Sequence, residues 1–184
     1  MITLPNEPKT IGVFVSGGLD SAILYYMVLQ ANANSRHTIV PITIIRTFTS
    51  VQTIQDMLNY VHSVFNLPAI KPTILTGSQV APAVQEAYNL GYDRVYVGII
   101  KELPEFLIGW ESSSHPENVF FKTPFKDMTK VDIVKLVKEQ QQETLFHITH
   151  SCANTVIGRC KECNRCRERK WAFDSLALTD PGVL

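Results

Sequence analysis

The hexapeptide Ser16-Gly-Gly-Leu-Asp-Ser21 restricts the fold of this chain more than any other feature. It follows an apolar run at 13–15 that predicts a buried strand, and it precedes apolar residues at helical spacing over 22–29. A glycine pair at such a junction lets the backbone turn sharply and approach a ligand without a Cβ in the way. The N–H groups and the dipole of the following helix favour an anion there. The sequence therefore predicts a phosphate-binding or pyrophosphate-binding turn.

This turn lacks the lysine of the common P-loop, G-x-x-x-x-G-K-[ST]. The pattern S-G-G-x-D-S instead resembles the pyrophosphate loop (PP-loop) of the ATP pyrophosphatases, which split ATP into AMP and pyrophosphate. The resemblance implies an ATP site made by Val15, Ser16, Gly17, Gly18, Leu19, Asp20 and Ser21. The simpler alternative is an ordinary strand-to-helix turn in which Asp20 or Ser21 caps the helix.

Strand and helix patterns alternate along the rest of the chain. Further strands are predicted over 38–45, 70–75 and 94–100, and helices over 51–65, 80–89 and 131–146. Pro41 indicates an edge position or an interruption of its strand. This alternation predicts an α/β fold, Rossmann-like and doubly wound around a mostly parallel sheet, in a single domain over 1–184.

Ligands of such sheets bind beyond the carboxyl ends of the strands. That rule groups the 16–21 loop with Gly98–Lys101 and Arg46–Thr49 around one crevice. Residues 101–118 show no clear period and are a candidate substrate lid, because long loops without structure of their own are often functional.

The composition is that of a globular protein, with 45% hydrophobic and 18% charged residues. Lys+Arg and Asp+Glu number 17 each, so the net charge does not indicate nucleic acid or an anionic membrane as partner. No apolar run approaches the roughly 20 residues that span a bilayer, and the N-terminus lacks a signal-peptide pattern. We expect a cytoplasmic protein without a membrane partner; its oligomeric state, including a homo-oligomer, stays open.

All four cysteines lie near the C-terminus, at Cys152, Cys160, Cys163 and Cys166. The spacing C-x7-C-x2-C-x2-C matches a closed tetrahedral zinc site, which predicts a zinc-binding C-terminal segment over 147–176. Disulfides and an iron–sulfur cluster are the alternatives. Four cysteines already complete the coordination shell, so His147 and His150 are expected to pack or to be exposed rather than to bind metal.

Basic residues crowd the same segment, namely Arg159, Lys161, Arg165, Arg167, Arg169 and Lys170. They are interpreted as cations that offset a zinc–tetrathiolate centre and cover a solvated helix. An anion-facing patch for nucleotide phosphate or nucleic acid is the alternative.

Together the two motifs resemble the 7-cyano-7-deazaguanine synthase family of the queuosine pathway. The resemblance rests on Ser16–Ser21, Val97-Gly98-Ile99, Lys122-Thr123-Pro124-Phe125, Ser151-Cys152, Cys160-x-x-Cys163-x-x-Cys166-x-x-Arg169 and Ala172-Phe173. It implies that ATP and Mg²⁺ activate the carboxylate of a 7-deazaguanine as an acyl-adenylate, which ammonia converts to an amide and a second adenylation to a nitrile. It also implies that Gly98 helps to bind ATP, that Asp20 and Ser21 are catalytic, with Asp20 organising the Mg²⁺, and that Zn²⁺ is structural.

Three segments depart from the family pattern. Ile45–Thr49 replaces an Asp-Tyr-Gly-Gln segment, Glu105–Gly109 replaces a Gly-Tyr-Pro-Asp-Cys segment, and no Val-Pro-Gly-Arg-Asn segment occurs near 75–80. These departures leave the exact substrate open. The alternatives are a tRNA-thiolating PP-loop enzyme, which typically needs a reactive cysteine outside the metal shell, and a non-catalytic zinc-bearing subunit.

Overall fold

One parallel sheet organises the molecule. The computed structural model describes residues 2–46, 50–76, 79–101, 118–155 and 158–183. Its strands follow the order β3-β2-β1-β4-β5, and all four neighbouring pairs run parallel. The strands are β1 (Thr10–Phe14), β2 (Thr38–Ile44), β3 (Thr73–Leu75), β4 (Arg94–Tyr96) and β5 (Phe121–Lys122).

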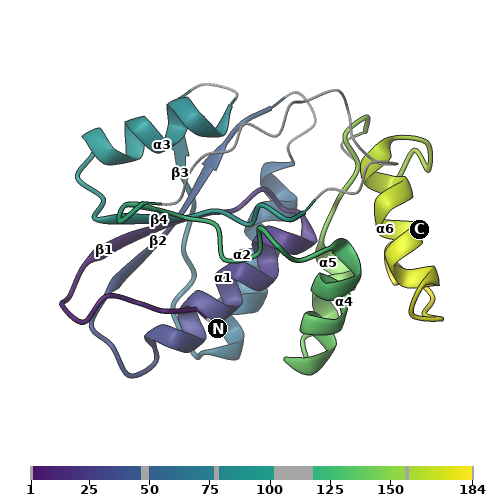
Figure 1. Ribbon diagram of the computed structural model, residues 1–184, viewed down its shortest axis with the longest axis horizontal. Coiled ribbons are helices and arrows are strands. Elements are labelled where there is room, and N and C mark those ends of the chain that lie inside the picture. Colours follow the sequence, from purple (N-terminus) through teal and green to yellow (C-terminus); the bar gives the residue numbers. More distant parts are fainter. Residues whose placement is uncertain (1, 47–49, 77–78, 102–117, 156–157, 184) are drawn as a thin grey trace.

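Helices cover both faces of this sheet, as Figure 1 shows. Helices α1 (Leu19–Asn32), α2 (Val51–Val64) and α4 (Lys130–Glu139) pack on one face, and α3 (Val80–Asn89) packs on the other. Successive strand side chains point to opposite faces, so Val13 joins the core under α1 whereas Phe14 joins the core under α3. The predicted doubly wound α/β fold is confirmed.

The chain leaves the sheet after β5 and ends in helical segments. Helices α5 (Thr144–Ile148) and α6 (Asn164–Asp174) follow α4, and a short 3₁₀ turn (Pro181–Val183) comes last. Helix α6 contacts α4 and lies beside the sheet rather than under it (Figure 1). The cysteine segment therefore reaches the sheet through α4 and through the residues around 150.

The prediction of one helix over 131–146 is wrong, because α4 ends at Glu139 and α5 begins at Thr144. Gln141 between them has φ 55°, a left-handed conformation that ends a helix. The N–H of Gln142 bonds back to the carbonyl of Val137 and completes this stop. The sequence carried a signal for it, since no apolar residue occurs between Val137 and Leu145.

Pro41 is expected at an edge position or an interruption of its strand; β2 as a whole lies between β1 and β3, but Pro41 itself pairs only with β1. The carbonyl of Ile42 accepts a bond from Val15 of the β1 side, so the imino nitrogen of Pro41 faces the β3 side. Pairing with β3 begins only at Ile42. Proline is tolerated here because its missing donor lies just before the first pair.

Other predicted elements differ from the structure or lie outside the described residues. The strands predicted over 70–75 and 94–100 are shorter than expected, and β5 was not predicted. Within the described residues, no helix has the length and apolar character needed to cross a membrane. The predicted lid, apart from its terminal residues 101 and 118, lies outside the described residues.

Candidate active site and metal centre

The Ser16–Ser21 loop connects the carboxyl end of β1 to α1. Gly17 has φ +79°, which favours glycine, and Gly18 is the N-cap residue of α1. The Ser16 N–H donates to Ser21 Oγ at 3.1 Å, and the Ser21 hydroxyl donates to the Gly18 carbonyl at 3.0 Å. These bonds hold the loop open at the start of α1, where first-turn N–H groups lack intrahelical acceptors. The loop has the form that an anion site requires.

The segment that contains Gly98 packs closely against the start of α1. Residues 97–100 leave the sheet after β4, and a Cβ on Gly98 would lie 3.1 Å from the Asp20 carbonyl carbon and oxygen. Any larger residue at 98 would therefore push this segment away from the first turn of α1. Gly98 thus permits close packing at the loop, and its part in binding ATP stays a prediction.

A cavity of about 380 Å³ opens beside the loop. Its lining residues come from several parts of the chain that are far apart in sequence, among them Val15, Ser16, Gly18, Asp20 and Ser21; Thr43, Ile44 and Arg46; Val97 to Ile100; Lys130; 150–153; and Arg165. The cavity brings the predicted loop, Gly98 and Arg46 together. Leu19 is instead fully buried in the core, Gly17 is not among the lining residues, and 47–49 lie outside the described residues.

Lys130 is a cavity residue that was not predicted from the sequence. It is the first residue of α4, and its ammonium lies 2.7 and 2.5 Å from the two carboxylate oxygens of Asp20. Glu168 of α6 lies 3.6 Å from the same ammonium. The Lys130 side chain is only 4% exposed. A lysine within a mixed polar and apolar helix pattern gives no sign of such burial, so this contact could come only from the tertiary structure.

Two arginines make another part of the cavity wall electropositive. Arg46 follows β2, and Arg165 belongs to the first turn of α6. Burial lowers the pKa of Arg46, and the nearby positive charge of Arg165 lowers it further. Two guanidinium groups at one cavity wall favour an anionic ligand group there.

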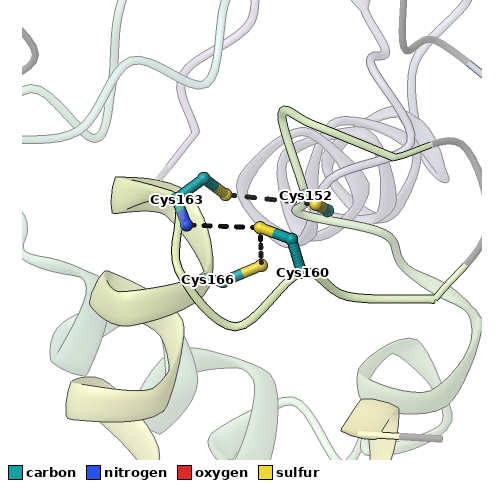
Figure 2. A group of neighbouring side chains, drawn as sticks. All are labelled: Cys152, Cys160, Cys163 and Cys166. Carbon is teal, nitrogen blue, oxygen red and sulfur yellow. Dashed lines mark hydrogen bonds between the residues drawn. The ribbon is translucent and has the colours of Figure 1, made fainter.

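The four cysteines converge in space as well as in sequence. Figure 2 shows their side chains pointing toward one another, Cys152 from the segment before α6 and the others from the loop and first turn of α6. All four sulfurs lie within 4.8 Å of one another, and the Cys152–Cys163 and Cys160–Cys166 pairs are 4.0 Å apart. Tetrahedral zinc–thiolate bonds place sulfurs about 3.8 Å apart, so this donor set fits one metal ion.

Hydrogen bonds prepare part of this set for metal binding. Burial disfavours the Cys152 thiolate, but the Thr155 hydroxyl and backbone N–H groups, among them that of Asn154, lower its pKa to about 5. Burial raises the pKa of Cys166 to about 12. Thiolates are the form that binds metal, so Cys166 requires the positive charge of an ion to ionise at neutral pH.

Of the two histidines near the cluster, His150 has another partner and His147 is exposed. His150 Nε2 donates to the Gly158 carbonyl at 2.7 Å, and the His147 side chain is exposed. The backbone N–H of His150 donates to the Gly17 carbonyl at 2.8 Å. Residue 150 therefore ties the PP-loop directly to the segment that carries Cys152.

The interpretation of the basic residues as cover for a solvated helix is wrong at Arg169, which is fully buried. Its guanidinium forms a bidentate pair with Asp180 at 2.9 and 3.0 Å and donates to the Phe146 carbonyl at 2.6 Å. Arg159 also pairs with Asp180. Two of the basic residues thus join the C-terminal turn to the cysteine loop and to α5.

Comparison with known proteins agrees with this geometry. The sequence model described as queuosine biosynthesis protein QueC matches residues 80–177, more than half of the chain. A 7-cyano-7-deazaguanine synthase of Persephonella marina is 41% identical over 59 residues, 32% of this chain and 25% of that protein. One of Oceanobacillus iheyensis is 27% identical over 112 residues, 54% of this chain and 50% of that protein. These matches thus span half of each relative's length or less.

Among solved structures, the U34-tRNA thiolase NcsA of Methanococcus maripaludis, with its [4Fe-4S] cluster, aligns over 97% of this chain and 69% of its own. The TM-score is 0.51 at 12% sequence identity, so this likeness concerns the fold alone. The parallel sheet and the loop after β1 define a PP-loop ATP pyrophosphatase fold with a C-terminal four-cysteine segment. Within that class, the chain belongs to the QueC family.

Proposed function

We propose that this chain activates a 7-carboxy-7-deazaguanine, or a close analogue, with ATP and converts it with ammonia to the amide and then to the nitrile. The observation that carries the proposal is the cavity in which the PP-loop, Lys130 and the segment before Cys152 meet, in a chain of the QueC family. Because ATP and reduced thiols belong to the cytoplasm, we place the reaction there.

The cavity residues divide the chemistry between them. The loop N–H groups with Ser16 and Ser21 would hold the ATP phosphates, and Asp20 would hold Mg²⁺, which supplies charge neutralisation for the departing pyrophosphate. The substrate carboxylate would attack the α-phosphorus, and ammonia would then displace AMP from the acyl-adenylate. In the second round the amide oxygen attacks ATP and leaves with AMP, so a nitrile remains. Arg46 and Arg165 supply the positive wall that suits the substrate carboxylate before adenylation.

For the metal site we propose Zn²⁺ held by Cys152, Cys160, Cys163 and Cys166 in a structural role. The sulfur separations, none above 4.8 Å, support a single tetrahedral ion. The [4Fe-4S] cluster of the thiolase neighbour favours the iron–sulfur alternative. Metal analysis and the absorbance of the purified protein distinguish the two, because an iron–sulfur protein is brown.

A tRNA-thiolating enzyme is the second candidate, and the fold of the thiolase neighbour supports it. All four cysteines of this chain belong to the metal cluster. A zinc-held thiolate is not free to attack a substrate, so this count argues against thiolation.

The test is incubation of the purified protein with ATP, Mg²⁺, ammonium and 7-carboxy-7-deazaguanine, with AMP, pyrophosphate and substrate mass followed together. We expect AMP release with a mass change to the amide or nitrile. Asp20→Ala should abolish turnover, whereas the control Glu162→Ala, at an exposed position of the cysteine segment, should not. AMP release only with tRNA and a sulfur donor would favour the thiolation enzyme, and absence of ATP turnover would refute both.

A further inference from the structure

Two carboxylates from opposite ends of the chain share one buried ammonium. Lys130 Nζ contacts both oxygens of Asp20 and lies 3.6 Å from Glu168 Oε2. The side chains of Lys130 and Glu168 are each 4% exposed, and that of Asp20 is 17% exposed. The three charged groups thus meet in a largely buried space beside the cavity, which Lys130 and Asp20 line.

Lys130 is held closely by Asp20 and only loosely by Glu168. Asp20 holds the ammonium by a close bidentate contact, whereas Glu168 Oε2 lies 3.6 Å from the same ammonium. A carboxylate engaged in this way with Lys130 is not available to a cation. If Asp20 turns to Mg²⁺, Lys130 loses its main partner, and a buried ammonium without a partner is strongly unfavourable. Glu168 is placed to prevent that state.

The position of Glu168 depends on the cysteine cluster. Helix α6 begins after Cys163, its N-cap residue, and Cys166 lies in its first turn. Glu168 is two residues further along the same helix. The metal-binding segment therefore fixes the helix from which Glu168 reaches Lys130.

We propose that Glu168 is a positioning residue that takes over the Lys130 ammonium when Asp20 turns to magnesium and pyrophosphate. This handover of the ammonium from Asp20 to Glu168 keeps Lys130 charged and in the cavity, near the phosphates. It also releases Asp20 from its ion pair with Lys130. This inference rests on the proposed function, because it requires that the loop binds ATP with Mg²⁺. The cysteine segment then has two roles: it holds its own fold, and it positions Glu168 next to Lys130.

Calorimetric titration of ATP tests the handover without reference to turnover. Binding is measured with and without added Mg²⁺, and Mg²⁺ is omitted rather than chelated so that the cysteine site keeps its metal. We expect Mg²⁺ to tighten ATP binding by the wild type, and Glu168→Gln to reduce that gain about tenfold, the scale of a 1.4 kcal/mol coupling. Binding without Mg²⁺ should stay unchanged, and the control Glu162→Gln should behave as the wild type.

A double-mutant cycle tests the sharing of Lys130 itself. Thermal unfolding is compared for the wild type, Asp20→Asn, Glu168→Gln and the double variant, without nucleotide. Each single variant leaves Lys130 one carboxylate, so we expect the double variant to lose more stability than the sum of the two.

The outcomes separate this inference from the proposed function. Failure of the wild type to bind ATP would overturn both. ATP binding with an undiminished Mg²⁺ effect in Glu168→Gln, or an additive cycle, would overturn only the handover. A Glu168→Gln protein that does not fold would also overturn it, because Asp20 alone should hold Lys130 in the nucleotide-free protein.

Discussion

At the scale of single residues, Arg169 has the largest number of described polar contacts near the metal centre. Its guanidinium reaches Asp180, the Phe146 carbonyl and the Thr149 hydroxyl, and it lies over the ring of Phe173. Such a group orders its neighbours only while its counter-charge is present, because a buried guanidinium without one is strongly unfavourable. Asp180 is that counter-charge.

The variant Asp180→Asn tests the role of the Asp180 carboxylate, because the stability that this carboxylate contributes depends on pH. Burial alone would raise the pKa of Asp180, but hydrogen bonds from Arg169 and the charges of Arg169 and Arg159 lower it below its usual value. The stabilisation is therefore complete above the unfolded pKa of about 3.9 and is lost as the pH falls through the lower folded pKa. We expect Asp180→Asn to cost about 3 kcal/mol at pH 7, with the difference from wild type shrinking below about pH 4.

Urea denaturation at several pH values measures this difference. The matched control is Asp174→Asn, whose carboxylate pairs with Lys170 at an exposed position, with 58% and 75% of the side chains accessible. An exposed pair contributes less than about 1 kcal/mol. Equal losses for both variants, or a loss that does not change with pH, would contradict the role given to Asp180.

The residues of the site were predictable only where they are close in sequence. The 16–21 loop and the four cysteines each form a local pattern with a known chemistry. Lys130 meets Asp20 across 110 residues and Glu168 across 38 residues, and nothing in their local sequence indicates a partner. Buried ion pairs of this kind depend on the packing of whole helices, which one sequence does not specify.

At the scale of elements, the start of α4 is the structure on which Lys130 depends. Thr129 and Asp132 form a capping box, in which the Thr129 hydroxyl accepts from the Asp132 N–H and the Asp132 carboxylate accepts from the Thr129 N–H at 2.9 Å. We expect Thr129→Ala to lower the free energy of unfolding by about 1 kcal/mol. Thr129→Ser keeps the hydroxyl and should lose much less. Chemical denaturation decides this, and equal stability of the two variants would refute the cap.

Helix and strand boundaries show what the periodic pattern could and could not predict. The end of helix α3 at Asn89 was predicted correctly, because a glycine, here Gly91 with φ +83°, commonly adopts the left-handed conformation that terminates a helix. The stop after α4 was missed because Gln141 is not a residue type that announces a left-handed turn. Strand β5 was missed because two residues, Phe121 and Lys122, carry no period and become a strand only by pairing with β4.

At the scale of the whole molecule, the cysteine cluster links the C-terminal helix to the PP-loop. Cys152, one of the four clustered cysteines, lies two residues after His150, whose N–H donates to the Gly17 carbonyl. We expect removal of the metal to lower the unfolding midpoint, at a cost on the order of several kcal/mol, and to weaken ATP binding as well. Zn²⁺ added back should restore both. Differential scanning calorimetry and ATP titration measure them, and unchanged ATP binding by the metal-free protein would show that the link carries no effect.

The strand order has a consequence for the way the chain is made. Of the five strands of the sheet, β1 is synthesised before the others and lies in the middle, and one of its two neighbours, β4, emerges about eighty residues later. The cavity needs still later residues, up to Arg165. A growing chain can therefore assemble β1, β2 and β3 early, yet it completes the cavity only when its cysteine segment has left the ribosome.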